Sequence, residues 1–270
     1  MLELKSLCKI FNAGTINEVM SLKNVNLRIE DGSFVCVLGT NGSGKSTLLN
    51  AVAGTFLVDS GYITLNGKDI TQWPEYKRAF HIGRVFQNPF SGTAPAMSIA
   101  ENLALAARRG KKRGLGWGLP DTLLNSLRDR VKSLNMGLED RLDTPIGKLS
   151  GGQRQALTLL MSSLVRPDLL LLDEHTAALD PKTASKVIEL TEKIVNEGKL
   201  TTLMVTHSMQ QAVNLGDRVI MMHQGSIRYD FQGEEKKRLK VNDLLSLFDE
   251  LRRKDQIDTT VADLLINSYV

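Results

Sequence analysis

The chain has 270 residues, 42% of them hydrophobic and 24% charged, which is ordinary for one large globular domain. Its formal net charge of +4 is mild and indicates a solvated surface rather than a dedicated binding patch. Two cysteines are too few for a disulfide scaffold, and no apolar run approaches the roughly 18–20 residues that span a bilayer. The N-terminal apolar segment is too short for a signal peptide, so we expect a cytosolic chain that reaches a membrane only through a partner.

The N-terminal third is predicted to form a small antiparallel β layer. Residues 2–10 and 20–29 alternate apolar and polar side chains, which is typical of half-buried strands. A further strand over 61–65 is followed by Asn66-Gly67, a dipeptide typical of tight hairpin turns.

A glycine loop stands between a predicted strand and a predicted helix. Residues 33–38 are short and apolar, 46–53 read as a helix start, and GTNGSGKST between them fits the phosphate-loop pattern G-x-x-x-x-G-K-[ST]. Such a loop turns its N–H groups inward as an anion nest, to which the helix N-terminus adds its own. Lys45 would reach the β- and γ-phosphates, and the Ser46 hydroxyl would bind Mg²⁺. The predicted nucleotide-binding residues are Gly39, Thr40, Asn41, Gly42, Ser43, Gly44, Lys45, Ser46 and Thr47.

The middle of the chain is predicted to be mostly helical, from about 90 to 165, after a strand over 80–87 that ends at Gln87. Helices are predicted over 98–109, 119–134 and 153–165. The glycine-rich, basic stretch 110–118 is interpreted as an exposed loop rather than an interaction patch.

Strands alternate with helices in the second half, which predicts a parallel sheet with right-handed crossovers. Strands are predicted over 169–172, 200–205, 218–223 and 226–231, and helices over 182–198 and 208–215. Beyond 232, apolar spacing predicts two short amphipathic helices, around 241–251 and 261–265, packed on their own domain. The expected fold class is α/β.

Polar side chains follow two of the predicted parallel strands. Asp173 and Glu174 come at the carboxyl end of 169–172, where ligands bind in such sheets. Asp173 is expected to hold Mg²⁺, directly or through water, and Glu174 to act as general base on an attacking water. His207 ends the strand 200–205 at the same edge, where donation to a γ-phosphate and a structural role are equally compatible with a lone histidine.

A second glycine turn, LSGGQRQ at 149–155, opens a predicted helix. Ser150 and the amides after it predict either a second anion site or an ordinary N-capped helix. The spacing of the residues leaves both interpretations open.

These motifs together resemble an ATP-binding cassette (ABC) ATPase over about residues 2–232. LSGGQ at 149–153 is similar to the family signature, GTNGSGKST to its Walker A motif and LLLLDE at 169–174 to its Walker B motif. Gln87 falls at the Q-loop, His207 at the switch histidine, and Phe11 where an aromatic ring stacks on adenine. The segment that resembles the D-loop is Ala178, Leu179 and Asp180.

The resemblance implies a P-loop NTPase with a RecA-like parallel-sheet core, an N-terminal antiparallel β layer and an α-helical subdomain at about 90–165. The ATPase domain would cover 1–232, and 233–270 would be a short helical extension. It implies ATP and Mg²⁺ as cofactors, with Ser46, Gln87 and Asp173 holding the metal. The catalytic residues it implies are Glu174, His207, Lys45 and Gln87.

The resemblance also implies partners. Two copies would form a head-to-tail homodimer, with Ala178, Leu179 and Asp180 at the interface. Each ATP would meet the other chain's Ser150, Gly151, Gly152 and Gln153. The dimer would drive an integral membrane permease at the cytoplasmic face of the membrane, with an extracytoplasmic substrate-binding protein and no nucleic acid. Gln87 and the helical region after it would contact the permease.

The tail and the stretch LLLDEHTAALDPKTA resemble a bacterial subgroup of tryptophan/tyrosine-type uptake ATPases, which implies import of an aromatic amino acid or similar small solute. An exporter shares the same motifs and stays open. A repair or ribosome-acting ABC protein is disfavoured, because the segment from Gln87 to Leu149 is too short for a long coiled coil and the chain holds one cassette. A P-loop kinase would not need LSGGQ. His175 stands where most relatives have proline, and its effect is left open.

Overall fold

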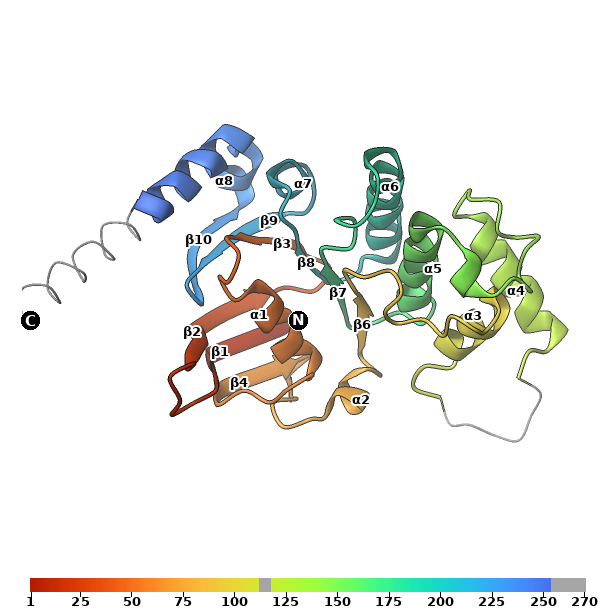
Figure 1. Ribbon diagram of the computed structural model, residues 1–270, viewed down its shortest axis with the longest axis horizontal. Helices are drawn as coiled ribbons and strands as arrows, with labels where there is room; N and C mark the ends of the chain where they lie inside the picture. Colours follow the sequence, from red (N-terminus) through yellow and green to blue (C-terminus); the bar gives the residue numbers. More distant parts are fainter. Residues whose placement is uncertain (112–117, 254–270) are drawn as a thin grey trace, which may run out of the picture.

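The computed structural model describes residues 1–111 and 118–253, which form two β-sheets with helices packed around them (Figure 1). The smaller sheet has four antiparallel strands in the order β2-β1-β4-β5. They are β1 (Leu2–Phe11), β2 (Val19–Ile29), β4 (Ser60–Leu65) and β5 (Lys68–Asp69). This sheet is the β layer that the alternating N-terminal segments predict.

The larger sheet has six strands in the order β10-β9-β3-β8-β7-β6. Its strands from β9 to β6 run parallel, and β10 pairs antiparallel with β9 at one edge. They are β3 (Phe34–Gly39), β6 (Ile82–Val85), β7 (Leu169–Asp173), β8 (Thr202–Val205), β9 (Arg218–His223) and β10 (Ser226–Gln232). The carboxyl ends of β3, β7 and β8 therefore lie at one edge, next to one another.

The parallel strands are apolar along their length because both faces of the sheet are buried. Successive side chains alternate between two hydrophobic cores. The core shared with the smaller sheet contains Val35, Val37, Leu169, Leu171, Leu203, Val205, Ile220 and Met222. The core on the other face contains Cys36, Leu38, Leu170, Leu172, Met204, Val219 and Met221.

Helix α1 (Lys45–Ala53) contributes its apolar side chains to the core shared with the smaller sheet. Three helices gather at the opposite end of the molecule, at the right of Figure 1, namely α3 (Ile99–Ala107), α4 (Asp121–Lys132) and α5 (Gly151–Ser163). Helices α6 (Pro181–Gly198) and α7 (Met209–Asn214) contribute to the core on the other face of the large sheet. The short helices are α2 (Glu75–Arg78), the 3-10 helix η1 (Ile146–Lys148) and α8 (Gly233–Arg238).

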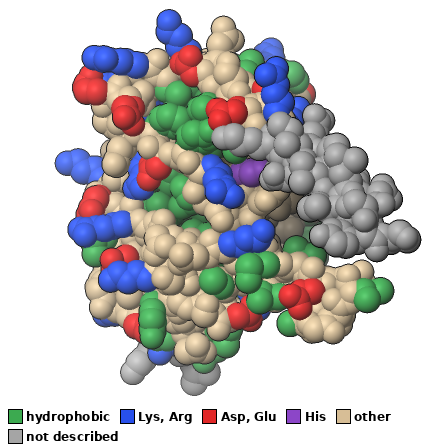
Figure 2. Space-filling model, turned by 90° about the vertical axis from the view of Figure 1, so that its left-hand side faces the viewer, with side chains coloured by type: hydrophobic (Ala, Val, Ile, Leu, Met, Phe, Trp, Pro, Cys, Tyr) green, Lys and Arg blue, Asp and Glu red, His purple; other side chains and the backbone are tan. Residues whose placement is uncertain are grey.

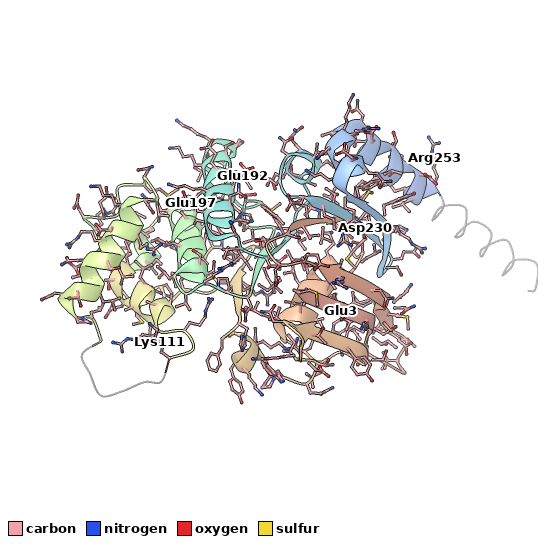
Figure 3. All side chains as sticks on the ribbon, turned by 180° about the vertical axis from the view of Figure 1, so that it is seen from behind. Glu3, Lys111, Glu192, Glu197, Asp230 and Arg253 are labelled. Carbon is pink, nitrogen blue, oxygen red and sulfur yellow. The ribbon has the colours of Figure 1, made fainter. Side chains whose placement is uncertain are left out.

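The last described segment is a helix over 241–253, called here the C-terminal helix. Its buried side chains Leu244, Phe248 and Leu251 join the core on the face of α6 and α7. Figure 3 shows this helix beside β10, with Arg253 at its end and Asp230 on the strand. No helix within the described part of the chain is long and apolar enough to cross a membrane.

The predicted fold class is confirmed, and several boundaries are corrected. Helix α5 begins at Gly151 rather than at 153, because the side chain of Ser150 caps it. Strand β6 covers only Ile82–Val85 of the predicted 80–87. Helices α2 and α8 were not predicted, nor was η1, which lies between α4 and α5. The predicted helix at 261–265 and residues 112–117 of the basic stretch lie outside the described residues.

Candidate nucleotide-binding site

The phosphate-loop segment joins β3 to α1, and glycine is required at two of its positions. A Cβ atom on Gly39 would lie 2.4 Å from the Met222 carbonyl oxygen. Gly44 caps α1 with a φ of 97°, and a Cβ there would lie 2.5 Å from the Ser21 carbonyl oxygen. The loop can therefore curl against β2 and β9 only with glycine at these points.

Lys45 is buried at the start of α1 and points into the loop. Its Nζ donates to the carbonyl oxygens of Gly39 and Thr40, at 2.9 and 3.0 Å. Burial lowers the pKa of Lys45, and the nearby carboxylates Glu174 and Asp173 oppose that shift. The cation thus stands within the loop, between the β3 end and the acidic end of β7.

Ser46 and Thr47 take different positions after the lysine. Ser46 is exposed at the first turn of α1. The Thr47 hydroxyl lies 2.7 Å from the Ser21 hydroxyl of β2, so it ties the helix to the smaller sheet. Of the two hydroxyls, Ser46 is the one available to a ligand.

The structure brings together three predicted catalytic residues from three strand ends. His207 Nε2 lies 2.5 Å from Glu174 Oε1, and Gln87 Nε2 donates to Glu174 Oε2 at 2.8 Å. Glu174 itself has a φ of 44°, a conformation that costs a non-glycine residue roughly 1–3 kcal/mol and is concentrated at functional sites. Its amide nitrogen donates to the Val205 carbonyl, which holds the turn against β8.

Asp173 is largely buried beside Arg84, a residue that the sequence interpretation missed. Arg84 Nη2 lies 3.7 Å from Asp173 Oδ2, and the guanidinium also donates to Asn50 and Thr55. Burial raises the pKa of Asp173, and Arg84 opposes the rise. The signal that could have revealed Arg84 is a charged residue inside the otherwise apolar strand β6, which needs a partner.

The donor atoms here suit a magnesium ion. Mg²⁺ prefers oxygen ligands, and three side chains here offer them: the hydroxyl of Ser46, the carboxylate of Asp173 and the amide oxygen of Gln87. The amide nitrogen of Gln87 donates to Glu174, so it does not compete for the metal position. Among the described residues no cluster of three His, Cys, Asp or Glu side chains could hold a metal by itself. Mg²⁺ in proteins is usually held by one or two carboxylates together with waters and substrate phosphates, and Asp173 supplies one such carboxylate here.

Phe11 is the last residue of β1 and forms an aromatic pair with Phe56. Its ring meets Phe56 edge-on, with centroids 5.3 Å apart and planes at 85°. Lys9 Nζ lies 5.5 Å from the Phe11 centroid and 5.4 Å from that of Phe56, and it pairs with Asp59 at 3.0 Å. Phe56 was not predicted, because an aromatic residue just after a helix carries no motif.

The signature-like segment caps α5. The Ser150 side chain accepts from the Gln153 amide at 3.3 Å, and Gln153 Oε1 accepts from the Ser150 amide at the same distance. This capping box satisfies the N-cap interpretation, and Ser150 is also exposed. Figure 1 places α5, the helix that Ser150 caps, beside α3 and α4 and apart from α1.

The D-loop-like residues lie against the same helix start. A Cβ on Gly151 would lie 3.4 Å from Leu179, and one on Gly152 only 1.9 Å from the Thr183 side chain. Asp180 caps α6 by accepting from the Thr183 amide at 3.1 Å. Hydrogen bonds from the Thr183 side chain and amide lower the pKa of the Asp180 carboxyl. The signature and D-loop segments thus form one contiguous surface.

Comparisons with known proteins show the family of this chain. The model of the family described as "ABC transporter" matches residues 22–177. A "Tyrosine transport ATP-binding protein" of Clostridioides difficile is 47% identical over 92% of this chain and 99% of its own length. A "Spermidine/putrescine import ATP-binding protein PotA" of Haemophilus influenzae is 34% identical over 85% of this chain, which spans 57% of that relative.

A solved structure has the same fold. It is the dimeric, post-hydrolysis state of an ATP-binding cassette bound to ADP and phosphate. It matches with a TM-score of 0.74 at 29% identity, over 86% of this chain and 98% of that one.

Proposed function

We propose a transport role for this chain from the premise that it belongs to the ABC transporter family, as an ATP-binding subunit with ATPase activity. Within that family we propose an importer subunit that acts as a homodimer and drives a separate membrane permease. The observation that carries the catalytic part is the Glu174 carboxylate, held between His207 and Gln87 at the acidic end of β7.

The proposed chemistry assigns a role to each side chain in this cluster. Glu174 takes a proton from the attacking water, and Gln87 orients its carboxylate through the hydrogen bond described. His207 and Lys45 donate to the phosphoryl oxygens as charge develops on them. A magnesium ion held by Ser46, Gln87 and Asp173 supplies further charge neutralisation when bound.

The adenine and dimer contacts complete the proposed site. Phe11 stacks on the adenine ring, with Phe56 supporting it edge-on. The residues Ser150 to Gln153 act on the nucleotide of the other chain, since Ser150 is exposed and α5 lies apart from its own α1. In a head-to-tail homodimer, the phosphate-loop segment of one chain faces Ser150 to Gln153 of the other. The surface that the signature segment forms with Ala178, Leu179 and Asp180 then lies at the dimer interface.

A groove between strand β6 of the large sheet and the helices α3 and α5 supports the permease contact. It has a volume of about 450 Å³ and receives residues from β6, α2, α3 and α5. Apolar side chains such as Phe86 and Leu105 line it, together with Arg84 and Arg109. The apolar lining fits a permease segment that presents apolar side chains, docked at the cytoplasmic face of the membrane.

The proposed cargo is an aromatic amino acid or similar small solute, delivered by an extracytoplasmic substrate-binding protein. The support is the relative named for tyrosine transport, which matches nearly end to end. Relatives named for import also favour uptake over export. On the face shown in Figure 2, acidic and basic side chains are interspersed rather than gathered in one basic patch, which disfavours nucleic acid there.

Replacing Glu174 with Gln tests the catalytic assignment. We expect turnover to fall by about 10²–10⁴-fold, because the amide cannot accept the proton from water, while ATP still binds. Steady-state phosphate release and nucleotide titration measure the two properties. The matched control is Glu197→Gln, the same chemical change at an exposed position on α6 labelled in Figure 3, which should keep full turnover. Wild-type turnover in Glu174→Gln would remove Glu174 from the mechanism.

Recovery of the tagged chain from detergent-solubilised membranes of its host tests the transport role. We expect a polytopic permease in stoichiometric amount, and a substrate-binding protein in the same complex if the direction is import. A permease without any binding protein would support the exporter alternative. Recovery with ribosomes or nucleic acid, and no permease, would leave only the ATPase chemistry.

A further inference from the structure

Arg154 is a buried cation that has no carboxylate partner among residues 1–111 and 118–253. It is the fourth residue of α5, and only 1% of it is exposed. Burial lowers the pKa of its guanidinium, and no acidic group within the described residues counteracts that shift. The positive end of the helix dipole also disfavours a cation in the first turn. Because an unpaired buried charge destabilises a fold, packing alone does not account for an arginine at this position.

The guanidinium holds the backbone that leads into the signature-like segment. Arg154 Nη2 donates to the carbonyl oxygens of Gly147 and Leu149, at 2.8 and 3.3 Å. Leu149 directly precedes Ser150, so these bonds fix the direction in which the chain enters the cap of α5. The Nε and Nη1 atoms of Arg154 make no hydrogen bond to any residue that the structure describes.

The other side of the guanidinium meets the loop that carries Gln87. Its central carbon lies 3.8 Å from the ring centroid of Phe90, which is a close cation–π contact. Phe90 is 59% exposed, so the ring covers the arginine rather than filling the core. Its amide donates to Asn88 Oδ1 at 2.9 Å, which fixes the turn after Gln87.

A second contact joins the same two segments. Gln155, the next residue of α5, is fully buried, and its Nε2 donates to the Phe86 carbonyl at 3.1 Å. Phe86 precedes Gln87 and Phe90 follows it. The start of α5 therefore contacts the Gln87 loop on both sides of the residue that bonds to Glu174.

We propose that Arg154 is a positioning residue that ties the Gln87 loop to the backbone before Ser150. The signature segment that a chain presents to its partner would then follow the state of that chain's own nucleotide, since Gln87 lies at that nucleotide. Displacing Gln87 moves Phe90, the guanidinium moves with the ring, and the carbonyls of Gly147 and Leu149 move with the guanidinium. The inference rests on the proposed homodimer and adds a coupling between its two ATP sites.

The test uses the full chain with Glu174→Gln as the non-hydrolysing parent. Arg154→Met removes the cation, Arg154→Lys keeps the charge without the planar fork, and Phe90→Leu removes the ring. Phe90→Tyr keeps the ring and is the matched control. Because Phe90 is largely exposed, its variants should fold normally even if an Arg154 variant does not. Sedimentation gives the ATP-dependent dimer dissociation constant, and nucleotide titration of dilute monomer gives ATP affinity.

We expect Arg154→Met, Arg154→Lys and Phe90→Leu to weaken the dimer by about tenfold, with ATP affinity of the monomer unchanged. Phe90→Tyr should match the parent, and the double variant Arg154→Met with Phe90→Leu should be no weaker than Arg154→Met alone. Amide hydrogen exchange of 150–153 should slow on ATP binding in the parent monomer and not in Arg154→Met.

Three results would overturn the inference. In the first, Arg154→Met and Phe90→Leu leave the dimer dissociation constant unchanged. In the second, the effects of the two substitutions on that constant add in the double variant. In the third, ATP affinity of the monomer falls together with dimerisation, which is the result expected of a purely structural role. A parent that never dimerises with ATP would refute the proposed homodimer as well. A parent that dimerises, with variants that behave like it, would refute only the role of Arg154.

Discussion

His175 turns its imidazole into the interior directly after the strained Glu174. It is 2% exposed, and its Nε2 lies 2.9 Å from the Thr191 hydroxyl of α6. That hydroxyl already donates to the Val187 carbonyl at 2.8 Å, so it accepts from a protonated Nε2 of a neutral ring. The histidine that stands in place of the usual proline therefore anchors the segment after Glu174 to the body of α6.

Burial of this ring makes the fold sensitive to acid. It lowers the pKa of His175 from 6.5 to about 4, so as pH falls the unfolded chain takes up a proton first. The contribution of the neutral His175 ring to the free energy of unfolding is fully present above pH 6.5. It falls by roughly 1.4 kcal/mol per pH unit as the pH is lowered to about 4. We expect the wild type to lose about 2 kcal/mol more unfolding free energy than His175→Gln between pH 7 and pH 5, measured by urea denaturation.

Other titrating groups are common to both proteins and cancel in this comparison. Parallel losses in the wild type and His175→Gln would show that the ring does not stay neutral in the folded state.

Helices α5 and α6 pack closely because residue 152 is a glycine. A Cβ on Gly152 would overlap the Thr183 side chain at 1.9 Å, whereas one on Gly151 would make ordinary contact with Leu179 at 3.4 Å. We expect Gly152→Ala to lower the unfolding free energy by about 1–3 kcal/mol through overpacking. Gly151→Ala should be neutral or stabilising by up to about 1 kcal/mol, because alanine favours helix. Urea denaturation of both variants measures the difference.

A neutral Gly152→Ala would mean that α6 shifts readily away from α5. A loss of stability in Gly151→Ala of the same size would contradict the assignment of the close contact to Gly152 alone.

Elements whose residues are defined by local physics could be predicted from the sequence. Strands β3, β7 and β8 were found because a sheet buried on both faces gives short, continuous apolar runs between turn residues. The phosphate-loop segment was found because its glycines and Lys45 are fixed by spacing. The start of α5 was missed because two glycines suggest a turn, although Ser150 and Gln153 carry the capping-box pattern.

What could not be predicted depends on contacts between distant segments. Helix α2 has four residues, too few to show a helical period. The pairing of Arg84 with Asp173 and the contact of Arg154 with Phe90 join segments far apart in the chain, and no local pattern encodes the partner. The sequence placed Glu174 and His207 at one sheet edge, but the distances between them required the strand order. Their catalytic roles stay predictions until turnover is measured.

On the scale of the whole molecule, the C-terminal helix packs as part of the large core rather than as a separate appendage. Leu244 is 0% exposed and its neighbour Leu245 is 46% exposed, which gives a matched pair one residue apart. We expect Leu244→Ala to lower the unfolding free energy by about 2–5 kcal/mol and Leu245→Ala by less than about 0.5 kcal/mol. A single cooperative unfolding transition should contain the whole effect.

Equal, small effects of the two substitutions would show that the C-terminal helix is an independent extension. A separate early transition in Leu244→Ala alone would show that the helix is attached but unfolds by itself.

The strand order also determines when, during synthesis, the chain can first hold a nucleotide. Strand β3 leads into the phosphate-loop segment, yet its neighbours β8 and β9 come from Thr202–Val205 and Arg218–His223. On the ribosome, β3 and α1 are synthesised early. Their neighbours β8 and β9 follow on the order of ten to thirty seconds later at usual elongation rates. We therefore expect a chain truncated before Thr202 to lack the neighbours β8 and β9 that hold β3 and the phosphate-loop segment in place.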